Sequence, residues 1–137
     1  MDDFADRVRT AHGDVVQVDA VAFEEAPELE RRWLEPHLAA ADCTVALAML
    51  DGRPVGTGFV LVSRGRGGAC AYVAGIAVPP DARGWGAGSR IMSWLLDRGF
   101  GAGADFAHLH PDTDATARVH ARLGFRETEG LDVYVDL

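Results

Sequence analysis

The chain has 137 residues and contains no lysine, so all 13 of its basic residues are arginine. A Walker phosphate loop needs a lysine beside the nucleotide phosphates, and Schiff-base catalysis needs a lysine amine, so both are excluded. Cysteine is also scarce. Cys43 and Cys70 each lie within an apolar, strand-like run, which predicts buried free thiols in place of a disulfide.

Positive charge is in the minority, because 21 acidic residues outnumber the arginines and give a net charge of -8. This balance argues against nucleic acid and anionic lipid as partners and favours cationic ones. No apolar run is long enough to span a membrane, and the acidic N-terminal residues do not resemble a signal peptide. We therefore expect a single domain over residues 1–137, located in the cytoplasm as a monomer or a homodimer.

The first third of the chain reads as helical. Residues 2–12 fit a short helix, whereas residues 14–23 fit either a strand or a helix by their apolar spacing, and the helix is favoured. Residues 27–41 predict a longer helix with Pro27 at its first position. Pro36 should break or kink that helix.

Three apolar segments separated by glycine turns follow, and they predict an antiparallel meander. The turns are Asp51–Pro54, which has a hairpin sequence, and Gly65–Gly68. The segments expected to form these strands are Cys43–Leu50, Val55–Ser63 and Ala69–Val78.

The C-terminal half alternates strand and helix patterns. Apolar residues at helical spacing predict a helix from Arg90 to Arg98 that ends at Gly99. A strand over 104–110, a helix over 113–123 and closing strands at 125–126 and 133–137 complete the pattern. A meander followed by strand, helix and strands is an α+β layout with one packed sheet.

A glycine-rich turn, Arg83–Ser89, lies between the third strand and the next helix. Glycines let a ligand approach the backbone, and the unpaired N–H groups of a helix N-terminus favour phosphate. A plain surface turn is the alternative. A dinucleotide-binding fingerprint fits less well, because Ser89 stands in place of its third glycine and Asp105 precedes the next apolar run instead of ending it.

Two segments together resemble the GNAT N-acetyltransferase superfamily. Arg83–Gly88 resembles its Arg/Gln-x-x-Gly-x-Gly/Ala signature, and Arg118–Phe125 resembles its second hallmark, which ends in Leu-Gly-Phe. They stand in the family's order and separation, and the resemblance covers roughly residues 43–137. It implies a GNAT-like α+β fold with a mostly antiparallel mixed sheet of about six strands flanked by helices. The family's usual first strand is not evident in the N-terminal residues.

The resemblance implies that acetyl-CoA is the acyl donor and that its pyrophosphate lies on the glycine turn. The pantetheine arm would run along the third strand. Thr113 stands where the family often has an asparagine that hydrogen-bonds this arm, and a threonine hydroxyl can also donate and accept. The residues expected to bind acetyl-CoA are Ile76, Ala77, Val78, Arg83, Gly84, Trp85, Gly86, Ala87, Gly88, Ser89, Thr113 and Thr116.

His120 replaces the family's usual tyrosine, the proposed acid that protonates the departing CoA thiolate. Imidazolium, with an ordinary pKa of about 6.5, suits this task near neutral pH better than a phenol with a pKa of about 10. A packing role for His120 is the alternative. If the tyrosine's loss abolishes catalysis, the chain would be a non-catalytic acyl-CoA-binding module that acts as a sensor or binds a partner.

The expected reaction is direct transfer of the acetyl group to a small amine. The acidic balance favours a cationic amine and an electronegative acceptor cleft. No carboxylate lies on the central strand, so the sequence names no general base. His108 and His110 share one strand face, but no metal site is expected because a clear third ligand is missing. The three tryptophans, Trp33, Trp85 and Trp94, are interpreted as packing residues.

Overall fold

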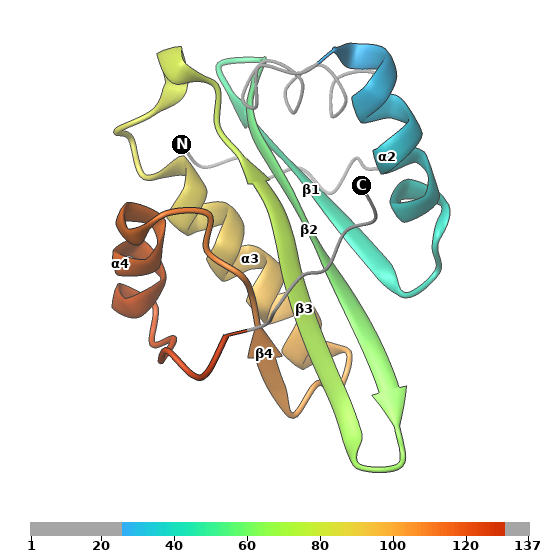
Figure 1. Cartoon of the computed structure of the whole chain (residues 1–137). Coiled ribbons are helices and arrows are strands. Elements are labelled where there is room, and N and C mark those ends of the chain that lie inside the picture. Colours follow the sequence, from blue (N-terminus) through green and yellow to red (C-terminus); the bar gives the residue numbers. More distant parts are fainter. Residues whose placement is uncertain (1–25, 131–137) are drawn as a thin grey trace, which may run out of the picture.

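The computed structural model describes residues 26–130. The helices expected over 2–12 and 14–23 and the strand over 133–137 lie outside this range. Figure 1 shows a sheet with α3 and α4 on one side and α2 on the other. The elements in chain order are α2 (Pro27–Ala39), β1 (Cys43–Leu50), β2 (Arg53–Gly65), β3 (Gly68–Ala77), the 3-10 turn η1 (Pro80–Ala82), α3 (Ala87–Gly101), β4 (Phe106–His108) and α4 (Asp114–Arg122).

Helix α2 begins at Pro27 as expected, but it continues through Pro36 to Ala39. Of the two expected effects of Pro36, a break or a kink, the break does not occur. Pro36 lies near the C-terminal end of the helix, where its missing N–H removes one hydrogen bond and few residues remain to be displaced. The helix packs on the sheet through Leu34, which is buried.

The meander forms as the sequence predicts, through two tight turns. Asp51 and Gly52 link β1 to β2 with φ angles of 49° and 77°. Two consecutive positive φ values characterise the type I′ turn, whose twist matches that of the paired strands. Residues 66–67 link β2 to β3 in the second turn, because Gly65 and Gly68 are already paired with each other.

The edge of the sheet differs from the prediction. Within residues 26–130 the sheet has four strands in the order β1-β2-β3-β4, in place of about six. The expected strand over 104–110 shortens to Phe106–His108, which runs parallel to β3 opposite Cys70–Tyr72. Residues 125–126 form no strand. Gly124 has a φ of 96°, and the Phe125 N–H turns back to the His120 carbonyl oxygen at 3.2 Å, so this segment terminates α4.

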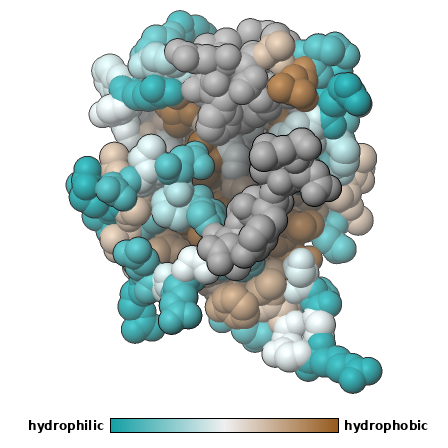
Figure 2. All heavy atoms as spheres, in the orientation of Figure 1, coloured by the Kyte–Doolittle hydropathy of each residue, from teal (hydrophilic) through white to brown (hydrophobic). Residues whose placement is uncertain are grey.

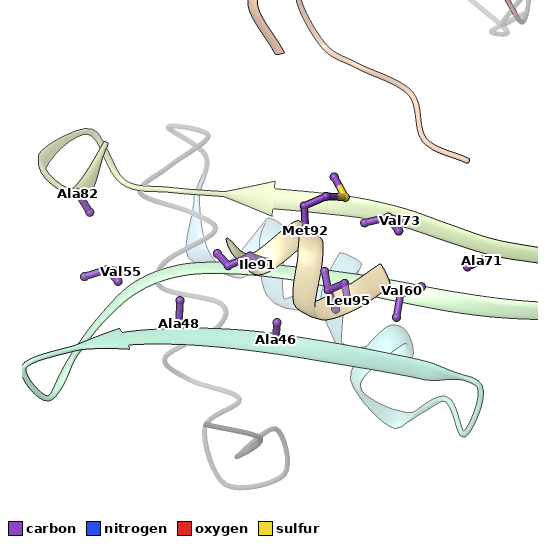
Figure 3. Packing of buried hydrophobic residues seen from close by; sticks show 10 residues of the cluster. All are labelled: Ala46, Ala48, Val55, Val60, Ala71, Val73, Ala82, Ile91, Met92 and Leu95. Carbon is purple, nitrogen blue, oxygen red and sulfur yellow. The ribbon is translucent and has the colours of Figure 1, made fainter. Parts of the chain in front are cut away.

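The main core lies between the sheet and α3, and Figure 3 shows the helix pointing its apolar side chains at the strands. Ile91, Met92 and Leu95 are each 2% exposed or less. They meet small and β-branched residues of the sheet, which allow the helix to lie close to it. A smaller cluster on the opposite face joins α2 to β1 and β2 through Leu34, Val45, Leu47 and Phe59.

Close packing of α3 on β3 depends on Gly99. A Cβ atom added there would lie 2.8 Å from the Ala71 Cβ and 3.3 Å from a Val60 methyl group. The Ala71 Cβ is fixed to its backbone and cannot turn away. We expect Gly99→Ala to destabilise the fold by about 1–2 kcal/mol, because overpacking exceeds the gain of about 1 kcal/mol in helix propensity.

Gly101→Ala is the matched control, since a Cβ in the last turn of the same helix meets no atom within 4 Å. Urea unfolding should show this control to be neutral or slightly stabilised. Adding Ala71→Gly to Gly99→Ala should recover part of the loss, because it removes the opposing Cβ. Purely additive effects of the two changes would contradict a contact between them.

Both cysteines are free, as expected, but each is half-buried and neither is fully enclosed. Burial raises the pKa of the Cys43 thiol to about 11, so this thiol stays protonated at neutral pH. In residues 26–130, no helix combines the length and the apolar character needed to cross a membrane.

Candidate functional site

A bulge in β3 sets the position of the site. Thr57 pairs with Ala77 and Phe59 pairs with Ala74, so one residue of β2 lies opposite two residues of β3, Gly75 and Ile76. Gly75 has a φ of 62°, and a Cβ there would meet the Phe59 ring at 2.9 Å. Glycine is therefore needed both for the turn of the backbone and for the contact.

The other edge of β3 is open beyond the bulge. Its ladder with β4 ends at Tyr72, and the chain after His108 leads away to α4. A cavity of about 1030 Å³ fills the space between them. The described lining comes from β3, the glycine turn, the start of α3, the segment 109–123 and, on the α2 side, from Trp33, His37, Phe59 and Tyr72.

The glycine turn forms one end of the cavity. Gly84 and Gly86 have φ angles of 85° and 78°, and no atom lies within 4 Å of the position that a Cβ would take at either residue. Helix α3 begins at Ala87, three residues before the predicted start, and Gly86 caps it without a side chain. The first intrahelical bond runs from the Arg90 N–H to the Gly86 carbonyl at 3.1 Å. The N–H groups of the first turn thus have no intrahelical acceptor, and they suit an anion.

Arg83 connects this turn to the end of β3. Its Nε donates a hydrogen bond of 2.8 Å to the carbonyl oxygen of Val78. The guanidinium group therefore fixes the path of the chain between strand and turn. It also lines the cavity, where its charge can attract an anionic ligand.

The structure brings almost all of the predicted site residues to this one cavity. Every residue expected to bind acetyl-CoA lines it except Trp85, and His120 lines it as well. Trp85 is 73% exposed and Trp33 is 61% exposed, so neither of these two belongs to the core. Trp94 does pack against the core, with the Arg98 guanidinium 4.6 Å from its ring centre.

Thr113 and Thr116 cap α4 reciprocally. The Thr113 hydroxyl oxygen accepts from the Thr116 N–H at 3.2 Å, and the Thr116 hydroxyl oxygen accepts from the Thr113 N–H at 3.0 Å. This capping box explains why α4 starts here. Since Thr116 also donates its hydroxyl proton to the Thr113 carbonyl oxygen, the Thr113 hydroxyl proton is left for the Thr116 hydroxyl oxygen at 3.3 Å or for a ligand.

His120 lies on α4 and is half-buried. Its Nδ1 is buried and has no hydrogen-bond partner in the described part of the chain. A buried unpaired N–H is costlier than a buried lone pair, so the proton belongs on Nε2, at the accessible edge of the ring. Burial lowers the pKa of His120, and the negative charge of Asp112 opposes this effect. Neutral imidazole is therefore the main form at pH 7, in contrast to the expected imidazolium.

The α2 side of the cavity carries a histidine that the sequence reasoning missed. His37 is half-buried, and its ring lies 4.6 Å from the Phe59 ring and 5.3 Å from the Trp33 ring. Its Nδ1 lies 2.9 Å from the Trp33 carbonyl oxygen. The spacing of four residues on a predicted helix was the only signal, because it aligns the two side chains on one face.

The strand histidines and Asp105 have other surroundings. His110 lines the cavity, whereas His108 stacks on Tyr72 with ring centres 5.2 Å apart. No group of three metal-ligating side chains occurs among residues 26–130. Asp105 accepts a hydrogen bond of 2.9 Å from the Ala69 N–H and donates its own N–H to the Ala69 carbonyl at 2.8 Å. It fastens β3 to the entry of β4 and is not free to bind a ribose.

Comparison with protein families matches residues 11–125 to the acetyltransferase (GNAT) family. None of the curated protein sequences matches the chain. Many solved structures share the fold, at low sequence identity.

Three of these solved structures illustrate the range. The aminoglycoside acetyltransferase AAC(6')-Iy in complex with a CoA bisubstrate analogue is 20% identical, with a TM-score of 0.78 and coverage of 94% of this chain and 93% of that chain. A transcriptional regulator from Bacillus halodurans C-125 is also 20% identical, with a TM-score of 0.78 and 97% coverage of both chains. Glucosamine-6-phosphate N-acetyltransferase from Arabidopsis thaliana is 16% identical, with a TM-score of 0.73 and coverage of 91% and 94%.

Proposed function

The chain belongs to the GNAT acetyltransferase family, and on that premise we propose that it transfers the acetyl group of acetyl-CoA to the amine of a small acceptor. The observation that carries this proposal is the single cavity that joins the glycine turn to the α2 side of the sheet past the β3 bulge. Acetyl-CoA can therefore enter this cavity from the glycine turn and the amine from the α2 side, and the two can meet at the β3 bulge.

The residues present fit acetyl-CoA. Gly84 and Gly86 leave room for a pyrophosphate beside the first turn of α3, where N–H groups point outward. The open edge at the end of β3, Ile76–Ala77, and the Val78 that follows it offer backbone groups to an extended pantetheine arm, and Thr113 offers a hydroxyl. When bound, acetyl-CoA supplies a thioester whose carbonyl carbon the amine attacks. Backbone N–H groups at the bulge would polarise that carbonyl.

His120 is proposed to serve the sulfur side of the reaction. Its neutral ring holds a proton at Nε2 and can donate a hydrogen bond to the departing sulfur. The protonated ring is a stronger acid than an ordinary histidine because its pKa is lowered, but it is less populated at pH 7. Its contribution should therefore grow as the pH falls.

The expectation of an electronegative acceptor cleft finds little support in the described lining. Asp112 is its only carboxylate, and it is balanced by Arg83 and Arg122. The other described acidic side chains are exposed, and Figure 2 shows hydrophilic residues over much of the face in view. The aromatic rings on the α2 side can hold either a cation or a flat apolar group, so both kinds of amine are candidates.

A non-catalytic acyl-CoA-binding module is the second candidate, because the family's tyrosine is absent. Release of free CoA thiol separates the two, measured with a panel of cationic and apolar amines. Calorimetry with acetyl-CoA should accompany it. Amine-dependent thiol release supports the transferase. Tight acetyl-CoA binding without release from any amine supports the module.

A further inference from the structure

We propose that His37 is the proton acceptor for the attacking amine, a role that neither the family match nor the similar structures assign to it. The inference rests on the proposed transferase function and deepens it. It supplies a general base for the reaction, which β3 cannot provide because this strand carries no carboxylate.

The hydrogen bond of His37 determines which ring nitrogen can act as a base. Its Nδ1 lies 2.9 Å from the Trp33 carbonyl oxygen, and a carbonyl oxygen can only accept. Nδ1 must therefore carry the proton in the neutral ring, which leaves a lone pair on Nε2. Nε2 has no hydrogen-bond partner among the described residues.

The ring is also held at a useful place. It is packed between Trp33 and Phe59, and the Phe59 ring lies against Gly75 at the bulge. His37 is thus one aromatic ring away from the point where backbone N–H groups can receive the thioester carbonyl. Helix α2 fixes it through packing and a backbone hydrogen bond, as preorganisation of a catalytic group requires. That position suits a base acting on the acceptor side, directly or through one water.

Among the described residues around His37, no other side chain is a better candidate for the proton acceptor. Phe59 on β2 contacts the His37 ring, and Tyr72 on β3 and the Cys43 thiol on β1 pack against the same apolar cluster as Phe59. The Tyr72 phenol O–H is a hydrogen-bond donor, and burial raises the pKa of the Cys43 thiol, which therefore keeps its proton at neutral pH. His110 lines the cavity but is exposed, and no described hydrogen bond selects its tautomer. On α2 itself, Glu35 is exposed.

The proton inventory of the step is complete. The amine nitrogen forms a bond to the carbonyl carbon and loses one proton to Nε2 of His37. The carbon–sulfur bond breaks and its electron pair remains on sulfur, which takes a proton from the His120 side or from water. His37 then returns its proton to solvent, and His120 regains from solvent any proton that it gave to sulfur, so no other reactant is required.

His37→Asn tests the proposal, because an asparagine amide can keep the donor toward the Trp33 carbonyl but has no base in place of Nε2. We expect kcat/KM to fall about 10²-fold at pH 8. The ratio of parent to variant kcat/KM should shrink toward one as the pH falls, because an imidazole acts as a base only in its neutral form. Titration of the amine and of His120 cancels in this ratio. A purely structural defect would give a ratio that does not change with pH, and would overturn the proposal.

His108→Asn is the matched control, since His108 lies outside the cavity lining and should leave the rate nearly unchanged. A loss equal to that of His37→Asn would contradict the assignment. Long-range ¹H–¹⁵N NMR of the free protein gives a readout independent of turnover. The parent spectrum should show a neutral His37 protonated at Nδ1, and protonation at Nε2 would overturn the proposal.

The experiment also separates this proposal from the proposed function. If the parent releases thiol with some amine and His37→Asn keeps its full pH profile, the transferase stands and the role of His37 falls. If the parent releases none with any amine, both fall. Matching urea midpoints for parent and variant ensure that a lost rate reflects chemistry.

Discussion

Replacing Gly86 by aspartate should weaken acetyl-CoA binding by about 10²- to 10³-fold. Gly86 caps α3, and a Cβ there would meet no atom within 4 Å, so a side chain would extend into the space proposed for the pyrophosphate. Two like charges about 4 Å apart repel by about 4 kcal/mol at a protein surface, and solvent and salt reduce this figure. The remaining penalty corresponds to the stated loss in affinity.

Gly86→Asn is the control because it adds nearly the same bulk without the charge. Both variants share the strain of a non-glycine residue at a φ of 78°, which acts on the fold before any ligand binds. Calorimetry should show a small loss of acetyl-CoA affinity for the Asn variant and a large one for the Asp variant. Urea unfolding should show similar stability for the two variants. Equal acetyl-CoA affinity for the parent and the Asp variant would exclude the glycine turn as the site.

Removing the His120 side chain should lower kcat by about 10²-fold near pH 6 and leave acetyl-CoA affinity nearly unchanged. The sign follows from the pKa, which burial lowers below its ordinary value of 6.5. As the pH rises above the lowered pKa of His120, the imidazolium form disappears, and the neutral ring can only donate its Nε2–H hydrogen bond to the sulfur. The ratio of the parent kcat to that of His120→Ala should then decline to about tenfold at pH 8 to 9.

His120→Gln separates proton transfer from hydrogen bonding, since its amide nitrogen can replace the Nε2–H donor but cannot act as an acid. We expect it to recover most of the rate at pH 8 and little of it at pH 6. Steady-state kinetics across pH 5.5 to 9 provide the measurement. If His120→Ala retains the parent kcat over the whole range, His120 is a packing residue and water protonates the sulfur.

Local patterns predicted those parts of the fold that local chemistry determines. The pair Asp51-Gly52 specifies its turn because both positions need positive φ, and the meander follows from it. The extent of β4 was not predictable in this way. Residues 104–110 are apolar enough for a longer strand, but pairing needs a neighbour, and the chain turns toward α4 after His108. At Phe125, a helix-terminating hydrogen bond replaced the expected strand.

The part of the site proposed to bind acetyl-CoA could be predicted because its residues lie in short, continuous sequence motifs. Arg83–Gly88 and the segment around His120 are recognisable motifs, and the fold brings them to one cavity. His37 belongs to no motif. Its place depends on how α2 packs against Phe59, a contact between residues 22 positions apart, and its tautomer depends on a carbonyl one turn away. Neither is visible before the chain is folded.

The brevity of the β3–β4 ladder has a consequence for the order of assembly. Strands β1, β2 and β3 are joined by two-residue turns, so their contacts close short loops and can form early. Strand β4 reaches β3 only after the chain has crossed α3, and three residue pairs then hold it. Amide hydrogens of β4 should therefore exchange with solvent sooner than those of β2. A ligand bound in this cavity would contact both the early-forming meander and the segment around β4, which forms last. Its binding should therefore slow amide exchange most in β4.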